Sequence, residues 1–363
     1  MVEPAAVSPA EPPRPSPPLL ADGAHGAPAY AALDLGTNNC RLLVGRPAGR
    51  GFSVLDSLSQ AVRLGEGLEE TGALDPAAMD RAAAALAACA ERLARWRVAG
   101  QAAVATEACR RATNGAEFLA RVRRETGISI AIISPREEAL LAIESCAPLL
   151  ARAATNGGRA PRRALLFDIG GGSTELAWLR LNPAGRPAMM GCASIPVGVV
   201  TLAERYGREA GTAAGYAAMT AATAPLLAPF ERVHCIAREI RQAEATGVLL
   251  LGTSGTVTTL AAIALSLPRY RRSLVDGACL SREEASRALA QLSALDPGGL
   301  LSHPCIGPDR ATFVLPGAAI FAAILETWPA PQLVVADRGL REGLLLRIMR
   351  AQGHPRGGAC HLP

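Results

Sequence analysis

The sequence predicts an α/β protein built from two related domains that face a cleft. A repeat is the first sign: "YAALDLGTNNCRLLV" (30–44) and "RALLFDIGGGSTELAWL" (163–179) share one order of apolar strand, aspartate, apolar residue, glycine, small polar residues and second strand. Short apolar runs also alternate with helical patterns from Tyr30 onward. A stretch rich in Gly, Asn and Pro, "ARAATNGGRAPRR" (151–163), separates the two repeats and suits a linker.

The length of 363 residues and the 50% hydrophobic composition are enough for two globular cores. We expect that the last helix of the second domain can pack back on the first. The proline-rich start has no basic n-region and no apolar h-region, so it is not a signal peptide and is expected to be disordered. The expected divisions are a tail (1–28), the first domain (29–150), a linker (151–163), the second domain (164–350) and a flexible tail (351–363).

Local signals define the elements of the first domain. Asp75 and Pro76 predict an N-cap and a first-turn proline for an alanine-rich helix. Asn114 with Glu117 predicts a capping box for a helix that ends at Gly127, and Ser134 with Glu137 predicts a second box. Strands are expected at 30–36, 40–46, 51–59, 102–106 and 128–134.

One uncharged stretch, residues 247–267, is about as long as a bilayer span. Its cluster Gly252-Thr253-Ser254-Gly255-Thr256 interrupts the apolar run, however. We therefore interpret it as a turn between a buried strand and a helix, and expect no membrane association.

The basic residues restrict the chemistry. The net charge is +5, and all 37 basic side chains are arginine because the sequence contains no lysine. A Schiff base and a Walker-type lysine are thereby excluded. Arginine binds phosphate oxygens with two parallel hydrogen bonds. We nevertheless favour a general composition bias as the reason for its abundance, because Ala, Gly and Pro are abundant as well. The nine cysteines are scattered without a CxxC pair, which is typical of reduced thiols in the cytoplasm.

Three glycine-containing turns predict anion binding. Glycine allows backbone amides to converge on an anion in Gly36-Thr37-Asn38, in Gly170-Gly171-Gly172-Ser173, and in Gly252 to Thr256 at a helix start. A plain β-hairpin is the alternative for any one of them. Because Asp34 and Asp168 precede two of the turns at matching positions, we favour a phosphate chain with a metal ion held near these aspartates.

An ordered set of motifs resembles the exopolyphosphatase and guanosine pentaphosphate phosphohydrolase (Ppx/GppA phosphatase) family. The motifs cover roughly residues 29–350 and are "ALDLGTNNCRLLV", "ATEACRRATNGAEFL", "IISPREEALLAI", "LLFDIGGGSTELAWL", "SIPVGVVTL", "LLGTSGTVTTLAAI" and "VVADRGLREGLLL". The resemblance implies two actin-like (ribonuclease H-like) domains flanking an interdomain cleft, in the short two-domain form of the family. It also implies Mg²⁺ or Mn²⁺ as cofactor.

The resemblance assigns roles to individual residues. Glu138 matches the family's general base, and Glu137 is expected to cap its own helix instead. Asp168, Glu175 and Asp34 match the surroundings of the metal, and Arg110 matches a phosphate-binding arginine. Without the resemblance, the preferred interpretation of Glu138 is a solvated first-turn acid, and an outward residue on its strand is the alternative for Glu175. Asp337-Arg338-Gly339 is expected to support the cleft, Arg111 is expected to be a surface charge, and Leu140 departs from the arginine common in the family. The remaining expected phosphate contacts are Gly36, Thr37, Asn38, Gly170, Gly171, Gly172, Ser173, Gly252, Ser254 and Gly255.

These observations predict a metal-dependent hydrolase that releases terminal phosphate from polyphosphate, from guanosine pentaphosphate, or from both. A phosphotransferase of the same superfamily and a non-catalytic protein that binds polyphosphate or an alarmone are the alternatives. Nucleic acid is not an expected partner, and a homodimer is one possible assembly.

Overall fold

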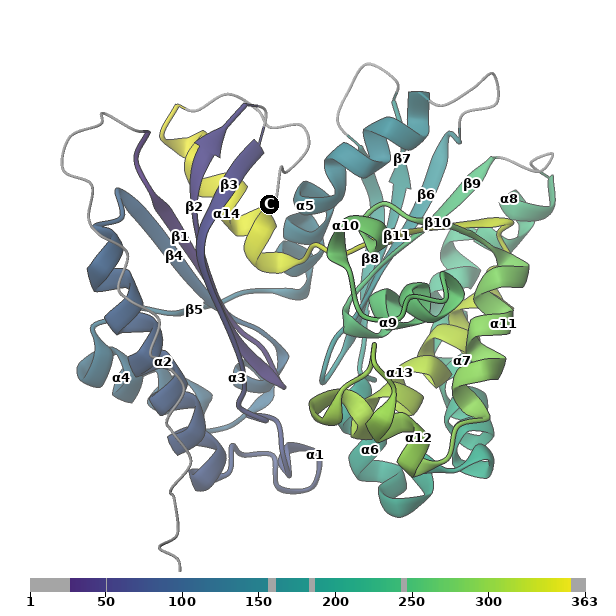
Figure 1. The fold of residues 1–363 in the computed structure, drawn as a ribbon, viewed down its shortest axis with the longest axis horizontal. Helices are drawn as coiled ribbons and strands as arrows, with labels where there is room; N and C mark the ends of the chain where they lie inside the picture. Colours follow the sequence, from purple (N-terminus) through teal and green to yellow (C-terminus); the bar gives the residue numbers. More distant parts are fainter. Residues whose placement is uncertain (1–26, 50, 156–160, 183–186, 243–246, 354–363) are drawn as a thin grey trace, which may run out of the picture.

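The computed structural model describes residues 27–49, 51–155, 161–182, 187–242 and 247–353. The expected tails therefore fall largely outside the described residues. The chain forms two α/β domains side by side, each built on one sheet (Figure 1).

The first domain contains a five-stranded sheet in the order β3-β2-β1-β4-β5. Strands β1 to β3 are antiparallel neighbours, whereas β4 and β5 run parallel to β1. Helices α2 and α4 cover one face, where Leu86 and Phe118 are buried in the core. The elements are β1 Tyr30–Leu35, β2 Asn39–Ala48, β3 Gly51–Ala61, α1 Leu68–Thr71, α2 Pro76–Trp96, β4 Gly100–Ala105, α3 Glu107–Arg111, α4 Gly115–Thr126 and β5 Ala131–Ile132.

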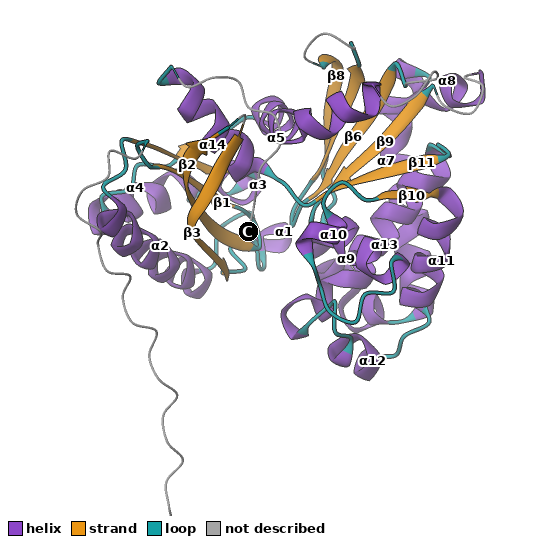
Figure 2. Cartoon of the chain, turned by 45° about the horizontal axis from the view of Figure 1, so that its top comes forward, coloured by secondary structure: helices purple, strands orange, loops and turns teal. Residues whose placement is uncertain are grey.

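The second domain repeats this arrangement and extends it. Its sheet has the order β10-β11-β9-β6-β7-β8, in which β8-β7-β6-β9-β11 corresponds to the first sheet, with the same parallel and antiparallel neighbours. Figure 2 shows its strands spread in a fan beside the helices. The fold of two ribonuclease H-like, actin-like domains is therefore confirmed.

The elements of the second half surround a core formed by Trp178, Phe321 and Trp328 among others. They are β6 Arg163–Ile169, β7 Thr174–Arg180, β8 Ala188–Ile195, α6 Val199–Tyr206, a 3₁₀ helix η1 Gly207–Gly211, α7 Ala213–His234, α8 Ile236–Gln242, β9 Val248–Thr253, α9 Gly255–Ala264, α10 Arg272–Val275, β10 Cys279–Ser281, α11 Arg282–Ser293, α12 Pro297–Ser302, α13 Pro308–Thr327, β11 Gln332–Ala336 and α14 Leu340–Ala351.

Two helices are exchanged between the domains. Helix α5 (Pro135–Thr155) follows the first sheet in the chain but packs on the second one, where Ile143 and Leu150 share a hydrophobic core with residues of β6, β7 and β9. Helix α14 ends the chain's last βα unit but packs on the first sheet through Leu344 and Leu345. Glu144 joins the two helices through ion pairs of 2.8 Å to Arg347 and 2.9 Å to Arg350. The domains are therefore connected by two crossovers.

Three local expectations need correction. The expected linker at 151–163 begins too early, because α5 continues to Thr155. The strand expected at 128–134 pairs only over Ala131–Ile132, both exposed at the sheet edge. Asn114 stands at the start of α4 but makes no capping bond; its side-chain amide instead holds the loop at Leu74 through hydrogen bonds of 2.8 and 3.0 Å.

The capping box of Ser134 and Glu137 is confirmed: each backbone amide donates to the other's side chain, at 2.9 and 3.2 Å. Residues 247–267 form β9 and α9 as expected. Among the described helices, α13 is long and apolar enough to meet the length and composition criteria for a membrane span. Because 67% of its most apolar window is buried inside the protein, α13 is weak evidence for membrane insertion.

Candidate active site

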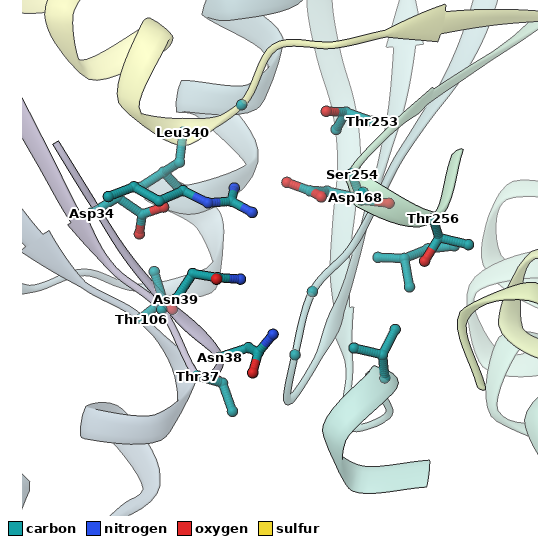
Figure 3. Close-up of a pocket in the computed structure, with 18 of the residues that line it drawn as sticks. Asp34, Thr37, Asn38, Asn39, Thr106, Asp168, Thr253, Ser254, Thr256 and Leu340 are labelled. Carbon is teal, nitrogen blue, oxygen red and sulfur yellow. The ribbon is translucent and has the colours of Figure 1, made fainter. Parts of the chain in front are cut away.

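A cavity of about 360 Å³ lies between the two domains. It is lined by the β1–β2 turn, the β6–β7 turn, the starts of α5 and α9, and the segment that joins β11 to α14. Figure 3 shows Asp34, Thr37 and Asn38 on one side of the cavity, facing Asp168 and Ser254 on the other. The sequence-predicted residues that line it are Asp34, Gly36, Thr37, Asn38, Glu138, Asp168, Gly170, Gly171, Gly172, Ser173, Glu175, Ser254 and Gly255.

The two turns have the same backbone geometry. The Gly36 amide donates to the Asn39 carbonyl at 2.9 Å, and the Gly170 amide donates to the Ser173 carbonyl, also at 2.9 Å. In each turn the donor glycine follows its aspartate by two positions and bonds to the residue three positions further on. The sequence repeat is therefore a structural repeat.

Close approach between the domains explains two of the glycines. A Cβ atom on Gly171 would lie 2.9 Å from Thr37 Cβ and 3.2 Å from the Asn38 nitrogen, and one on Gly172 would lie 3.0 Å from Thr37 Oγ1. Neither glycine has a positive φ, nor do Gly36 and Gly170. These turns therefore do not need glycine for a left-handed conformation; the bare backbone of the second turn accommodates the first turn across the cleft.

The two aspartates face the cavity without partners. Among the described residues, neither Asp34 nor Asp168 makes a side-chain hydrogen bond or ion pair, and burial raises the pKa of both. For Asp168, the neighbouring Glu175 adds to the effect of burial, and its pKa reaches about 7. A bound cation would relieve this cost by neutralising the charge.

Glu175 is not an outward-facing strand residue, since it is only 2% exposed. Its Oε1 accepts hydrogen bonds from Ser173 Oγ at 2.6 Å and from Ser194 Oγ at 2.9 Å. Burial nevertheless raises its pKa above the ordinary value.

Glu138 lies in the first turn of α5 and faces the cavity, whereas its neighbour Glu137 is exposed and occupied by the capping box. Burial and then the charge of Glu175 raise the pKa of Glu138 well above its usual value, while Arg110 acts in the opposite direction. A carboxyl group with a raised pKa that faces a cavity is a suitable general base near neutral pH.

Arg110 is placed differently from the expectation. It does not line the cavity, because its guanidinium bonds to Glu107 Oε2 at 2.6 Å, Glu138 Oε2 at 3.3 Å and the Ile133 carbonyl at 2.8 Å. Its hydrogen-bonding capacity is thus directed at two carboxylates, and its clearest function is to orient Glu138.

The cavity is instead lined by four arginines that were not among the expected phosphate contacts: Arg41, Arg310, Arg338 and Arg341. Arg338 is held by Asp276, with the shortest contact at 2.7 Å, which agrees with a supporting function for its segment. Arg41 has no ion-pair partner among the described residues. The repeat contains a signal for Arg41, because it follows its aspartate by seven residues, as Glu175 follows Asp168.

The third turn contributes through α9. Ser254 caps this helix with a φ of 117° and a ψ of 167°, a strained conformation for a residue with a side chain and one that often marks a functional site. Gly252 does not line the cavity. A Cβ atom there would lie 2.6 Å from the Phe167 ring, so packing explains this glycine.

The side chains present are compatible with a hard divalent cation. Asp34, Asp168 and Glu175 offer oxygen ligands, and Asn38 Oδ1 is buried without a hydrogen-bond partner. No group of three acidic, histidine or cysteine side chains in the described parts of the chain is arranged to hold a metal ion alone. This donor set fits Mg²⁺ or Mn²⁺, which commonly take one or two carboxylates and complete their coordination with water and substrate phosphates.

The fold and the site define a two-domain α/β protein with buried acidic side chains and glycine-containing turns lining the cavity between its domains. The family model of the Ppx/GppA phosphatase family matches residues 43–352, and the chain belongs to this family.

Curated relatives include guanosine-5'-triphosphate,3'-diphosphate pyrophosphatases. The protein of Vibrio cholerae is 31% identical over 326 residues, or 89% of this chain and 60% of the relative. That of Aeromonas salmonicida is 30% identical over 90% of this chain and 60% of its own length. The chain thus spans about three-fifths of the length of these relatives.

Solved structures match over nearly their full length. An exopolyphosphatase-like protein is 26% identical with a TM-score of 0.76, covering 90% of this chain and 98% of its own. The Ppx/GppA family member of Aquifex aeolicus is 25% identical with a TM-score of 0.68, covering 90% and 99%.

Proposed function

We propose that the protein is a metal-dependent phosphoanhydride hydrolase that releases terminal phosphate from inorganic polyphosphate, guanosine pentaphosphate, or both. The observation that carries the proposal is the composition of one cavity. A carboxylate with a raised pKa, two unpaired aspartates, two amide-rich turns and four arginines all face the same space.

The reaction requires little covalent assistance from the protein. A water molecule attacks the terminal phosphorus and transfers its proton to the Glu138 carboxylate, while the bond to the bridging oxygen breaks and the shortened phosphate chain leaves with the electron pair. Arg110 orients Glu138, and the turn amides and Arg41 stabilise the phosphate charge. No enzyme nucleophile is involved.

One or two of the carboxylates of Asp168, Glu175 and Asp34 would hold the cation, and water and substrate phosphates would complete its coordination. When bound, Mg²⁺ or Mn²⁺ would neutralise the negative charge that develops on the phosphate oxygens. The described cysteines are free thiols, which supports a cytoplasmic location.

A matched pair of variants tests the assignment of the base. Glu138→Gln keeps the shape but removes the proton acceptor, so kcat falls on the order of a hundredfold or more while substrate affinity is retained. Glu137→Gln, one residue away, removes the negative charge from the capping box but keeps an acceptor oxygen, so the melting temperature falls slightly with little change in kcat. Equal losses of kcat from both substitutions would contradict the assignment of Glu138 as the general base.

The acid limb of the wild-type rate profile gives a second measurement. Glu138 must be deprotonated to act, and its folded pKa is raised, so activity is present above that pKa and declines as the pH falls through it. The decline is expected at a higher pH than that of an ordinary glutamate.

A further inference from the structure

A continuous series of ion pairs connects the second domain to Glu138 across the interdomain boundary. Arg205 Nη2 in α6 lies 2.6 Å from Glu69 Oε1 in α1 of the first domain. Glu69 Oε2 in turn lies 3.4 Å from Arg111 Nη1. Figure 1 shows α1 reaching from the first domain toward α6.

The series continues inward from Arg111. Its Nε lies 3.8 Å from Glu107 Oε1, Glu107 Oε2 lies 2.6 Å from Arg110 Nη2, and Arg110 Nη1 lies 3.3 Å from Glu138 Oε2. The charges alternate in sign at every step, and side-chain exposure falls from 44% at Arg205 to 12% at Glu138. We call these six residues, Arg205, Glu69, Arg111, Glu107, Arg110 and Glu138, the charge chain.

The outer end of the charge chain is reinforced by a second interdomain bond. The Gly67 amide, just before α1, donates to Glu204 Oε1 in α6 at 2.8 Å. Partial burial raises the pKa of Glu69, but its hydrogen bond to Arg205 and the charges of Arg205 and Arg111 lower it overall. Glu69 is therefore ionised near neutral pH.

Backbone hydrogen bonds attach this contact to both turns of the cavity. On the first-domain side, the amide of Gly65 donates to the Thr37 carbonyl at 2.9 Å. On the second-domain side, α6 begins against the other turn, where the Val199 amide donates to the Gly170 carbonyl at 3.0 Å and the Val200 amide donates to the Gly171 carbonyl at 2.8 Å. The contact between α1 and α6 thus lies on a path that holds the two turns in register.

We propose that Glu69, Arg111 and Arg205 are positioning residues, which couple approach of the two domains to the orientation of Glu138 through the charge chain. Closure brings Arg205 to Glu69; Arg111 is then shared between Glu69 and Glu107, and Glu107 fixes the guanidinium that contacts Glu138. This inference rests on the proposed function of Glu138, whereas the contact between α1 and α6 can be tested without it.

The experiment combines hydrogen exchange with phosphate release from tripolyphosphate under Mg²⁺. Arg205→Gln and Glu69→Gln are expected to raise amide exchange in residues 62–74 and to lower kcat about two- to fivefold, as for a partly exposed pair, with KM unchanged. The double variant behaves like Glu69→Gln alone, because both changes act through one contact. Arg208→Gln, exposed in the adjoining η1, is the control and leaves both measurements unchanged.

Arg111→Gln distinguishes an effect through the charge chain on Glu138 from an effect of the contact between α1 and α6 alone. It breaks the middle of the charge chain but leaves the Arg205–Glu69 pair, so kcat falls with little change in amide exchange in residues 62–74. Unchanged kcat in Arg111→Gln, additive losses in the double variant, or unchanged exchange in Arg205→Gln would each overturn the proposal. If the wild-type protein releases no phosphate from any substrate, the proposed function fails, while the exchange measurements still report on the contact between α1 and α6.

Discussion

The β1–β2 and β6–β7 hairpins share their antiparallel pairing and the hydrogen bond of their turns but differ in charge. In the strand register, Asp34 lies opposite Arg41 in the first hairpin, and Asp168 lies opposite Glu175 in the second. The charge of Arg41 lowers the pKa of Asp34 against the larger effect of burial, whereas Glu175 raises that of Asp168 further.

This difference shows how a duplicated element can acquire two functions. The first hairpin, with a cation opposite its aspartate, is suited to attract an anionic substrate. The second hairpin, with two carboxyl groups, is suited to a metal ion and to the reacting phosphate. The predictions for Glu175 and Arg41 separate turnover from affinity on this basis, and the prediction for Gly171 separates turnover from stability.

Glu175→Gln is expected to have the largest effect of the substitutions in the two hairpins. Removing one carboxylate beside Asp168 lowers kcat about 10- to 100-fold and weakens Mg²⁺ activation, because a ligand or its support is lost. Steady-state kinetics across a Mg²⁺ titration measure this effect. A variant with altered KM but normal kcat and metal response would contradict the assignment.

Arg41→Gln is expected to raise KM about tenfold with a smaller change in kcat, because one charged hydrogen bond to phosphate is lost. The wild-type affinity should also weaken as salt rises, and less so in the variant. Arg46→Gln on the same strand lies outside the cavity lining and is the control. If both arginine variants behaved alike, the first hairpin would not be the anion-binding one.

Gly171→Ala is expected to have the smallest effect. The added methyl group presses on Thr37 across the cleft, so kcat falls a few-fold, while the melting temperature changes little because the backbone angles are ordinary. Gly170→Ala differs, since its Cβ would lie 2.9 Å from the Ser173 carbonyl within its own turn and should destabilise the fold. Matching thermal melts for the two variants would contradict this distinction.

The repeat in the sequence was sufficient to predict both hairpins, because an aspartate followed by a glycine turn has a local signature. The reason for the glycines was not predictable: Gly171 meets Thr37 from the other domain, and no local pattern records that contact. Arg110 was misplaced for the same reason, since Glu107 and Glu138 approach it only in the folded chain.

The position of α5 also required the structure. Its sequence predicts a helix with a capping box, and the helix follows the first sheet directly. Only the packing of Ile143 and Leu150 on the second sheet shows that it belongs to the joint between the domains. Apolar spacing defines which face of a helix is buried but not which sheet covers it.

The central claim is that the cavity between the two hairpins releases terminal phosphate, and a side-by-side release assay tests it most directly. Long polyphosphate, tripolyphosphate and guanosine pentaphosphate are each incubated with the protein, with Mg²⁺ or with a chelator and without any acceptor. We expect Mg²⁺-dependent release of phosphate from at least one of them, and release from the same substrate that is slower by on the order of a hundredfold or more with Glu138→Gln. Tight binding without release under any divalent metal, or transfer that requires an acceptor, would contradict the claim.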